Sequence, residues 1–137
     1  MQRVQGILET AIYVADLQRA ADFYRRVFSF PTLLQSERLI ALDVAGNSVL
    51  LLFLAGATGE PNVTPGGVIP PHRGAVQGHL AFSISADDVE PWQERLASEG
   101  IEVESTVHWP GDARSLYFRD PDQTLVELIT PGFWSIY

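Results

Sequence analysis

The strongest constraint on the fold is a segment in the middle of the chain, Ala55 to Gln77, in which residues that break regular structure are concentrated. Its prolines and glycines are Gly56, Gly59, Pro61, Pro65, Gly66, Gly67, Pro70, Pro71 and Gly74. Proline removes a backbone donor and glycine adds conformational freedom, so this density excludes a continuous helix or a central strand. We therefore predict a connection over residues 55–77, either a solvated linker or, at Pro70 to Gly74, a lid over a binding site.

The residues before this connection, 7–54, have the pattern of a strand, a helix and three more strands. Ile7 to Val14 alternates between two faces, which is the strand period. Asp16 is placed to cap a helix that continues at helical spacing to about Phe28 and stops before Pro31. The three further predicted strands are Thr32 to Gln35, Leu39 to Val44 and Ser48 to Leu54, the last two joined by a Gly46-Asn47 turn.

The residues after the connection, 78–130, repeat this order. A strand pattern at Gly78 to Ser85 precedes a helix that Asp87 or Asp88 caps and Gly100 ends. The helix buries Val89, Trp92 and Leu96, and three strands follow at Ile101 to His108, Arg114 to Arg119 and Thr124 to Thr130, with Asp120 to Gln123 as the last turn. The sequence thus predicts an α+β protein of two βαβββ modules, 7–54 and 78–130, in one domain spanning 1–137. Residues 131–137 form an apolar C-terminal tail.

Composition narrows the class of protein. A chain of 137 residues with 46% hydrophobic content is long enough for one core and short for two independent domains. The net charge of −8 repels phosphate backbones, so we expect no nucleic-acid partner. Without cysteine, any metal must be bound by His, Asp or Glu. No leader pattern or membrane-spanning run is present, so we expect a cytoplasmic protein with no membrane contact.

Two ionisable residues stand out on the predicted strands. His79 begins a strand whose other outward residues, Ala81 and Ser83, are small. It is either a rim histidine bonded to a neighbour or part of a site. Glu127 interrupts the apolar strand at Thr124 to Thr130, where an unpaired carboxylate would be costly. It requires an exposed edge, an arginine partner such as Arg114 or Arg119, a proton or a metal.

Alignment of the two halves at their strand–helix junctions makes these positions equivalent to others. Glu9 falls on His79, and Leu51 falls on Glu127. Identity between the halves is low, so the repeat rests on element order and strand phase.

Three motifs occur in a fixed order along most of the chain, from about Ile7 to Thr130. They are Asp16-Leu17 followed by Phe23-Tyr24, then Gly78-His79-Leu80-Ala81-Phe82, then Tyr117-Phe118-Arg119-Asp120-Pro121-Asp122 leading to Val126-Glu127-Leu128. In these motifs the sequence resembles the vicinal oxygen chelate superfamily, which includes glyoxalase I, bleomycin-resistance proteins and extradiol dioxygenases. The resemblance implies two βαβββ modules with mixed sheets that curl around one cavity.

The resemblance also implies a metal site on the first and last strands of each module. In this chain Glu9, His79 and Glu127 become the metal ligands, with Glu127 also the catalytic residue, while Leu51 departs from the glyoxalase I pattern. One imidazole and two carboxylates suit one divalent ion, Zn, Ni, Mn, Fe or Co, without selecting among them. The expected function is metal-dependent isomerase, lyase or dioxygenase chemistry on a small oxygen-bearing substrate. The alternative is a metal-free protein that sequesters a small molecule, as bleomycin-resistance proteins do.

The residues expected to shape the substrate pocket surround these ligands. They are Tyr13, Leu51, His108, Trp109, Arg114 and Tyr117. Arg114 suits an anionic substrate and Trp109 a ring, although Arg114 paired with Asp112 or Asp120, and Trp109 filling a seam between sheets, fit the pattern as well. His72 reaches the site only if the connection closes as a lid. Open sheet edges and the apolar tail predict a homodimer, with the tail packed across the interface or over a sheet.

Overall fold

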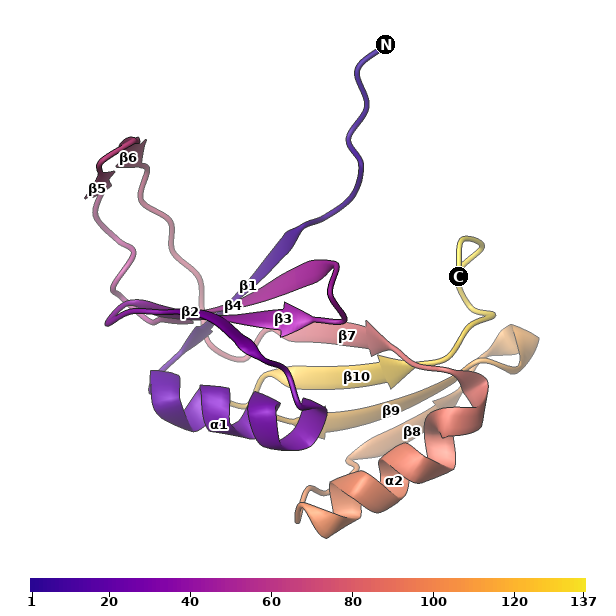
Figure 1. Ribbon diagram of the computed structural model, residues 1–137. Coiled ribbons are helices and arrows are strands. Elements are labelled where there is room, and N and C mark those ends of the chain that lie inside the picture. Colours follow the sequence, from indigo (N-terminus) through magenta and orange to yellow (C-terminus); the bar gives the residue numbers. More distant parts are fainter. The chain divides into compact units, whose positions relative to one another are not determined.

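The computed structural model describes residues 1–137, and it has the α+β architecture expected from the sequence (Figure 1). The chain divides into two compact units, Met1–Val76 and Gln77–Tyr137. Each unit contains one βαβββ module with a four-stranded mixed sheet. No helix of either unit has the length and apolar character that a membrane span requires.

The helix of the first unit, α1 (Leu17–Phe28), begins and ends at residues that satisfy its terminal groups. The Asp16 carboxylate accepts a hydrogen bond from the Arg19 backbone N–H at 3.0 Å. At the other end Ser29 adopts the left-handed conformation, with φ 59°, and its N–H bonds to the Arg25 carbonyl. The helix buries one apolar face, consisting of Ala20, Ala21, Phe23, Tyr24 and Val27.

The sheet of the first unit has the order β1-β4-β3-β2. Its strands are β1 (Glu9–Val14), β2 (Thr32–Gln35), β3 (Leu39–Val44) and β4 (Ser48–Leu54). The edge strand β1 pairs in parallel with β4, and the pairs β3–β4 and β2–β3 are antiparallel. Because side chains alternate across a strand, Ile12 and Val14 are buried towards the core while Glu9, Ala11 and Tyr13 share the opposite face. The strand predicted from Ile7 begins two residues later, and Leu8 is exposed.

The connection 55–77 contains regular structure that the sequence analysis did not predict. A two-stranded hairpin, β5 (Asn62–Thr64) and β6 (Gly67–Ile69), turns at Pro65 and Gly66. The Thr64 hydroxyl donates to the Gly67 carbonyl at 2.7 Å across this turn. Proline and glycine exclude a central strand, but they are favourable in the turn of a hairpin outside the main sheet.

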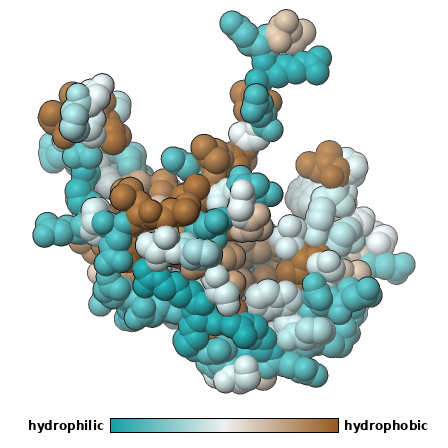
Figure 2. Space-filling view, viewed as in Figure 1, coloured by the Kyte–Doolittle hydropathy of each residue, from teal (hydrophilic) through white to brown (hydrophobic).

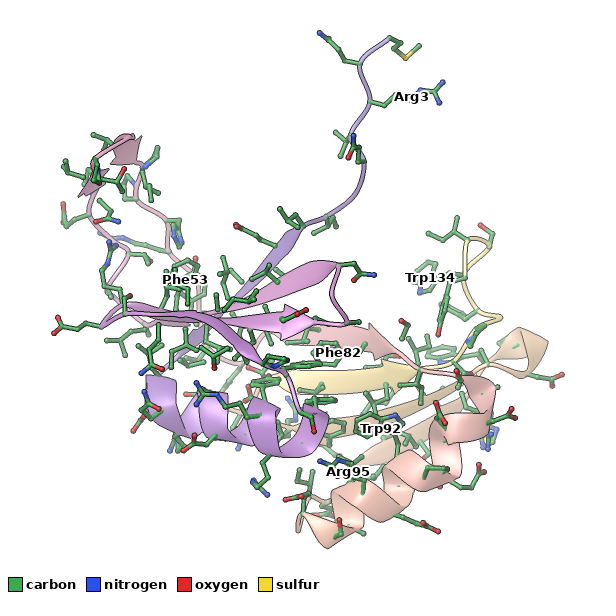
Figure 3. The ribbon with its side chains drawn as sticks, in the orientation of Figure 1. Arg3, Phe53, Phe82, Trp92, Arg95 and Trp134 are labelled. Atoms are coloured by element: carbon green, nitrogen blue, oxygen red, sulfur yellow. The ribbon has the colours of Figure 1, made fainter.

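The end of the connection is attached to the first unit at His72, while Pro70, Pro71, Arg73 and Gly74 are exposed to solvent. The Thr58 hydroxyl donates to the His72 carbonyl at 2.6 Å, and the His72 N–H donates to the Thr58 carbonyl at 2.9 Å. These two bonds hold His72 against the sheet, where its ring lies 4.7 Å from that of Phe53. Figure 3 shows Phe53 at the base of the hairpin.

The second unit has the corresponding sheet, in the order β7-β10-β9-β8. Its elements are β7 (His79–Ser83), η1 (Ala86–Asp88), α2 (Val89–Ser98), β8 (Ser105–His108), η2 (Pro110–Asp112), β9 (Arg114–Arg119) and β10 (Leu125–Ile129). The helix α2 lies along one face of this sheet (Figure 1) and buries Val89 and Leu96, while Trp92 is half-buried. The turn before β10 forms as predicted, because the Asp120 carboxylate accepts from the N–H groups of Asp122 and Thr124.

The strand predicted at Ile101 to His108 is shorter in the structure, where only Ser105–His108 is regular. Residue 100 is a left-handed glycine, and the Ile101 N–H bonds to the Leu96 carbonyl at 2.9 Å. The chain therefore closes the end of α2 before it enters the sheet.

The C-terminal tail folds onto its own unit, as one of the two predictions for it required. The Tyr137 hydroxyl donates to the Ile84 carbonyl at 2.8 Å, and the Phe133 ring lies 4.6 Å from that of Trp109. The backbones of Gly111 and Gly132 approach so closely that a Cβ atom on either would overlap the carbonyl oxygen of the other. Two glycines therefore allow the tail to lie against the loop before β9.

Candidate functional site

His79 and Glu127 lie on neighbouring strands of the second unit. β7 and β10 pair in parallel with His79 opposite Leu125 and Ala81 opposite Glu127. In the antiparallel pair β9 and β10, Tyr117 is opposite Glu127. These side chains share the face of the sheet that lies away from α2.

Hydrogen bonds from β9 fix the Glu127 carboxylate. Glu127 is only 7% exposed, and its Oε1 accepts from the Ser115 hydroxyl at 2.6 Å and from the Tyr117 hydroxyl at 2.9 Å. Neither expected arginine is its partner, because Arg114 pairs with Glu90 at 3.0 Å and Arg119 with Glu104 at 2.9 Å. Two hydroxyl groups thus offset part of the cost of burying a carboxylate, and Oε2 remains directed at His79.

The backbone sets the orientation of the His79 imidazole. Its Nδ1 lies 2.9 Å from the Leu125 carbonyl, and its Nε2 lies 3.3 Å from Glu127 Oε2. A carbonyl only accepts hydrogen bonds, so Nδ1 carries the proton. In the neutral imidazole, Nε2 then presents a lone pair to the carboxylate.

Two electron-pair acceptors that face each other at this distance require a cation or a proton between them. An imidazole nitrogen and a carboxylate oxygen are suitable ligands for a divalent transition metal, and each is held by the kind of outer hydrogen bond that orients metal ligands. The pair therefore fits two positions of a metal site. Neither unit by itself contains a cluster of three such side chains.

Tyr117 has a perturbed acidity for the same structural reason. Burial raises the pKa of its phenol above the usual value of 10, and the hydrogen bond to the Glu127 carboxylate adds to this effect. The phenol therefore remains a donor throughout the neutral range. It binds the carboxylate and is unsuited to act as a base there.

Trp109 extends this hydrogen-bond chain. Its indole Nε1–H donates to Ser115 Oγ at 2.8 Å, and Ser115 donates to Glu127. Ser115 was not among the residues predicted for the site. Its signal in the sequence is weak, because it is only a small polar residue on the same strand face as Tyr117.

His108 and Arg114 lie elsewhere in the second unit. They pair with each other across β8 and β9, one residue out of phase with Ser115 and Tyr117, which places them on the α2 side of the sheet. Arg114 accordingly reaches Glu90 on α2 and the Ala86 carbonyl. The structure does not bring these two residues to Glu127, nor does it pair Arg114 with Asp112 or Asp120.

Three predicted residues of the first unit line a cavity of about 640 Å³ on the sheet face opposite α1. They are Glu9, Tyr13 and Leu51. His72 joins them, because its Nδ1 lies 2.6 Å from the Tyr13 hydroxyl. Apolar side chains, including Leu39, Phe53 and Ile69, form much of the remaining wall. Figure 2 shows apolar surface on and beside the hairpin.

The parallel strand pairs confirm the equivalence inferred by aligning the halves. Glu9 is opposite Val49 and Ala11 opposite Leu51 in the first unit, as His79 is opposite Leu125 and Ala81 opposite Glu127 in the second. Glu9 thus occupies the position of His79, and Leu51 that of Glu127. At these two positions the first unit has one potential metal ligand, Glu9, whereas the second unit has two.

Residues 6–128 match the family described as Glyoxalase/Bleomycin resistance protein/Dioxygenase superfamily. The chain belongs to this superfamily, which confirms the resemblance inferred from its motifs and the α+β fold of two βαβββ modules that it implied.

Individual relatives show how far the similarity extends. The metallothiol transferase FosB of Bacillus licheniformis is 29% identical over 129 residues, covering 93% of this chain and 77% of that protein. The fosfomycin resistance protein FosX of Listeria monocytogenes is 24% identical over 133 residues, covering 91% and 89%. The crystal structure of lactoylglutathione lyase from Agrobacterium tumefaciens has a TM-score of 0.88 at 32% identity and covers 98% of this chain and 99% of that one.

Proposed function

We propose that this protein is a divalent-metal-dependent enzyme that acts on a small oxygen-bearing substrate, with Glu9, His79 and Glu127 as metal ligands. The observation that carries the proposal is the contact of 3.3 Å between His79 Nε2 and Glu127 Oε2. Both atoms have a free electron pair in the neutral imidazole and the ionised carboxylate. Leu125, Ser115 and Tyr117 hold the two groups from behind, so the pair is oriented before any ion binds.

Glu9 is the proposed third ligand because it is the strand equivalent of His79. Three protein ligands leave coordination positions for two substrate oxygens, and a bound divalent ion would stabilise negative charge that develops on those oxygens. The chain's own contribution is to orient the ligands, since two donated hydrogen bonds hold the Glu127 carboxylate in place. Tyr13 and Leu51, on the same strand face as Glu9, are the proposed substrate contacts in the first unit.

The relatives direct the choice of reaction. One is named a metallothiol transferase and one a lactoylglutathione lyase, so the proposed chemistry includes group transfer as well as lyase and isomerase reactions. Leu51, where glyoxalase I has a ligand, favours a three-ligand site. O₂-dependent cleavage is a further reaction that we propose for the same site.

Metal analysis tests the proposal. Protein purified without chelator and then titrated with Mn²⁺, Fe²⁺, Co²⁺, Ni²⁺ or Zn²⁺ should take up about one equivalent per chain, measured by calorimetry and elemental analysis. Glu127→Gln keeps the shape of the side chain but removes the charge, and it should lower the affinity at least about tenfold. Glu104→Gln, at an exposed carboxylate, is the matched control. Uptake below about 0.1 equivalent for every metal would exclude the enzyme.

A metal-free binding protein is the second candidate, and the first unit's cavity of about 640 Å³ favours it. Its wall is largely apolar and carries the Glu9 carboxylate together with the Arg38 guanidinium, which suits an aromatic compound whose cationic group lies at Glu9. This candidate predicts tight binding of such compounds without added metal and no change on treatment with chelator.

A further inference from the structure

A small pocket opens beside the Glu127 carboxylate, and aromatic rings form most of its wall. Its volume is about 190 Å³, and its rings come from Trp109, Tyr117, Phe133 and Trp134. Phe133 and Trp134 belong to the C-terminal tail, which no part of the proposed metal chemistry uses. Figure 3 shows Trp134 on this tail, beyond the end of β10.

The tail is fixed at several points, so the pocket is a built feature. Phe133 packs on Trp109 with ring centres 4.6 Å apart, and Trp134 meets Phe133 edge-on at 4.9 Å. The Gly132 N–H bonds to the Tyr137 carbonyl, and the Tyr137 hydroxyl donates to the carbonyl of Ile84, the residue that follows β7. These contacts hold the two tail rings above the sheet face that carries Glu127.

The wall offers little to a polar ligand group apart from the carboxylate. The indole N–H of Trp109 is engaged with Ser115, and the hydroxyl of Tyr117 with Glu127. Ala81 and Ile129 complete the lining with small and branched apolar groups. The part of a ligand that enters this pocket therefore contacts ring faces and methyl groups. The ligand atoms next to that part lie beside the Glu127 carboxylate.

The volume sets the size of the ligand group. An apolar cavity of about 150 Å³ in another protein holds one benzene molecule, so 190 Å³ accommodates a single ring or a short branched alkyl chain. It is too small for a helix or a folded partner segment. Proximity to a proposed metal ligand means that the group is carried by the same molecule that supplies the oxygen donors.

We propose that this tail-capped pocket selects substrates that carry one aromatic ring or a short branched alkyl group next to their metal-binding oxygens. The inference rests on the proposed metal-dependent function and adds the class of substrate to it. Phe133 and Trp134 are then specificity-determining residues, and the tail is part of the binding site.

Two hydroxamates test this inference, because they share the same pair of oxygen donors and differ only in the apolar group. Benzohydroxamate and acetohydroxamate are titrated into the metal-loaded full-length chain, and their affinities are measured by calorimetry and by quenching of tryptophan fluorescence. We expect benzohydroxamate to bind at least about tenfold more tightly. Trp134→Ala should reduce this preference to below about threefold, because benzohydroxamate loses a ring contact, and the metal content measured in parallel reports whether the metal site is still intact.

Control variants make the result interpretable. Ile136→Ala changes a residue of the same tail that is 94% exposed and outside the pocket, so it should keep the wild-type preference. Phe133→Ala should act as Trp134→Ala does, and circular dichroism of each variant reports folding. Because Trp134 is 61% exposed, its removal does not depend on repacking a core.

Two results overturn the inference separately from the function. If metal binds but the two hydroxamates have equal affinity, the pocket does not select apolar groups and the metal site stands. The same conclusion follows if the preference persists in Trp134→Ala. If no metal is taken up, the proposed function fails first, and the inference that rests on it fails with it.

Discussion

Glu127 illustrates how an apolar strand can accommodate a buried carboxylate. The carboxylate is buried, yet Ser115 and Tyr117 donate to one oxygen and the other faces His79. Satisfying Oε1 lowers the cost of burial, and the demand for a cation concentrates at Oε2. The structural role and the proposed metal-binding role therefore belong to different atoms of the same side chain.

Removal of the Ser115 hydroxyl should weaken metal binding without unfolding the protein. Ser115→Ala takes away the 2.6 Å bond to Glu127 and leaves the indole of Trp109 without its acceptor. Loss of such an outer hydrogen bond typically costs about 10- to 100-fold in metal affinity. Calorimetric titration with Mn²⁺ or Zn²⁺ measures this, with Ser98→Ala at the exposed end of α2 as the control. An unchanged affinity would show that Ser115 does not position the carboxylate.

Tyr117 should titrate above the usual range in the metal-free protein. Burial and the hydrogen bond to Glu127 raise its pKa above 10, so the folded state holds the phenol proton more tightly than the unfolded state does. This contribution to stability is fully present below about pH 10, the unfolded value, and is lost as the pH rises through the folded pKa. Ultraviolet titration of the wild type against Tyr117→Phe isolates the group. A midpoint below 10 would contradict the assignment.

At the scale of elements, α1 depends on its N-terminal cap. Asp16 is the residue that satisfies the Arg19 N–H, so Asp16→Ala should lower the free energy of unfolding by about 1 kcal/mol. Urea denaturation followed by circular dichroism measures the change. Asp22→Ala serves as the comparison, because its exposed ion pair with Arg25 at 3.4 Å should contribute less than about 0.5 kcal/mol. An equal decrease in the free energy of unfolding in the two variants would contradict a specific contribution from the Asp16 cap.

The connection before β7 depends on a glycine where it crosses the first sheet. A Cβ atom at Gly74 would overlap the Tyr13 ring, so Gly74→Ala should displace Pro70 to Gly74 and break the contact of 2.6 Å between Tyr13 and His72. Nuclear magnetic resonance of the His72 ring protons reports the loss. Gly66→Ala is the matched control, because no atom lies within 4 Å of its added Cβ. Indistinguishable His72 spectra for wild type and Gly74→Ala would contradict the close approach.

At the scale of the whole molecule, we expect a homodimer. Each sheet ends in edge strands, and Leu33 and Leu34 on β2 are more than half exposed. Light scattering after size exclusion should give about twice the chain mass of 15.1 kDa. A monomer at all micromolar concentrations would exclude this assembly.

Mixed dimers identify the chain that supplies Glu9 to each proposed metal site. Glu9→Ala and Glu127→Ala should each lose metal when pure. Unfolding and refolding an equal mixture restores about a quarter of the wild-type metal content if Glu9 comes from the opposite chain, because half of the molecules are then mixed and one of their two sites is intact. If Glu9 comes from the same chain, no site recovers.

Strand phase and the cap of α1 were readable from the sequence, because both depend on residues that are close along the chain, whereas Asp88 at the start of α2 makes no side-chain capping bond. Asp16, Pro31 and the alternation around β1 fixed the first unit to within two residues, and the equivalence of Glu9 with His79 followed from element order. The short β8 and the hairpin β5–β6 were missed. β8 is short because the residue after Gly100 bonds to the end of α2 and so is not available to the sheet. The hairpin was missed because its prolines and glycines were interpreted only as breaks in regular structure, although they also favour a turn.

The sequence by itself determined the fold class, the family and the choice of His79 and Glu127 as the residues to examine. Only the tertiary structure decided their partners: Ser115 and Tyr117 bind the carboxylate in place of Arg114 or Arg119, His72 joins Tyr13, and His108 with Arg114 faces α2. The physical reason is that the period of a strand assigns each side chain to one face of the sheet. Its hydrogen-bond partner depends instead on the register between strands and on where loops such as 70–74 pack against the sheet. Those are set by long-range contacts.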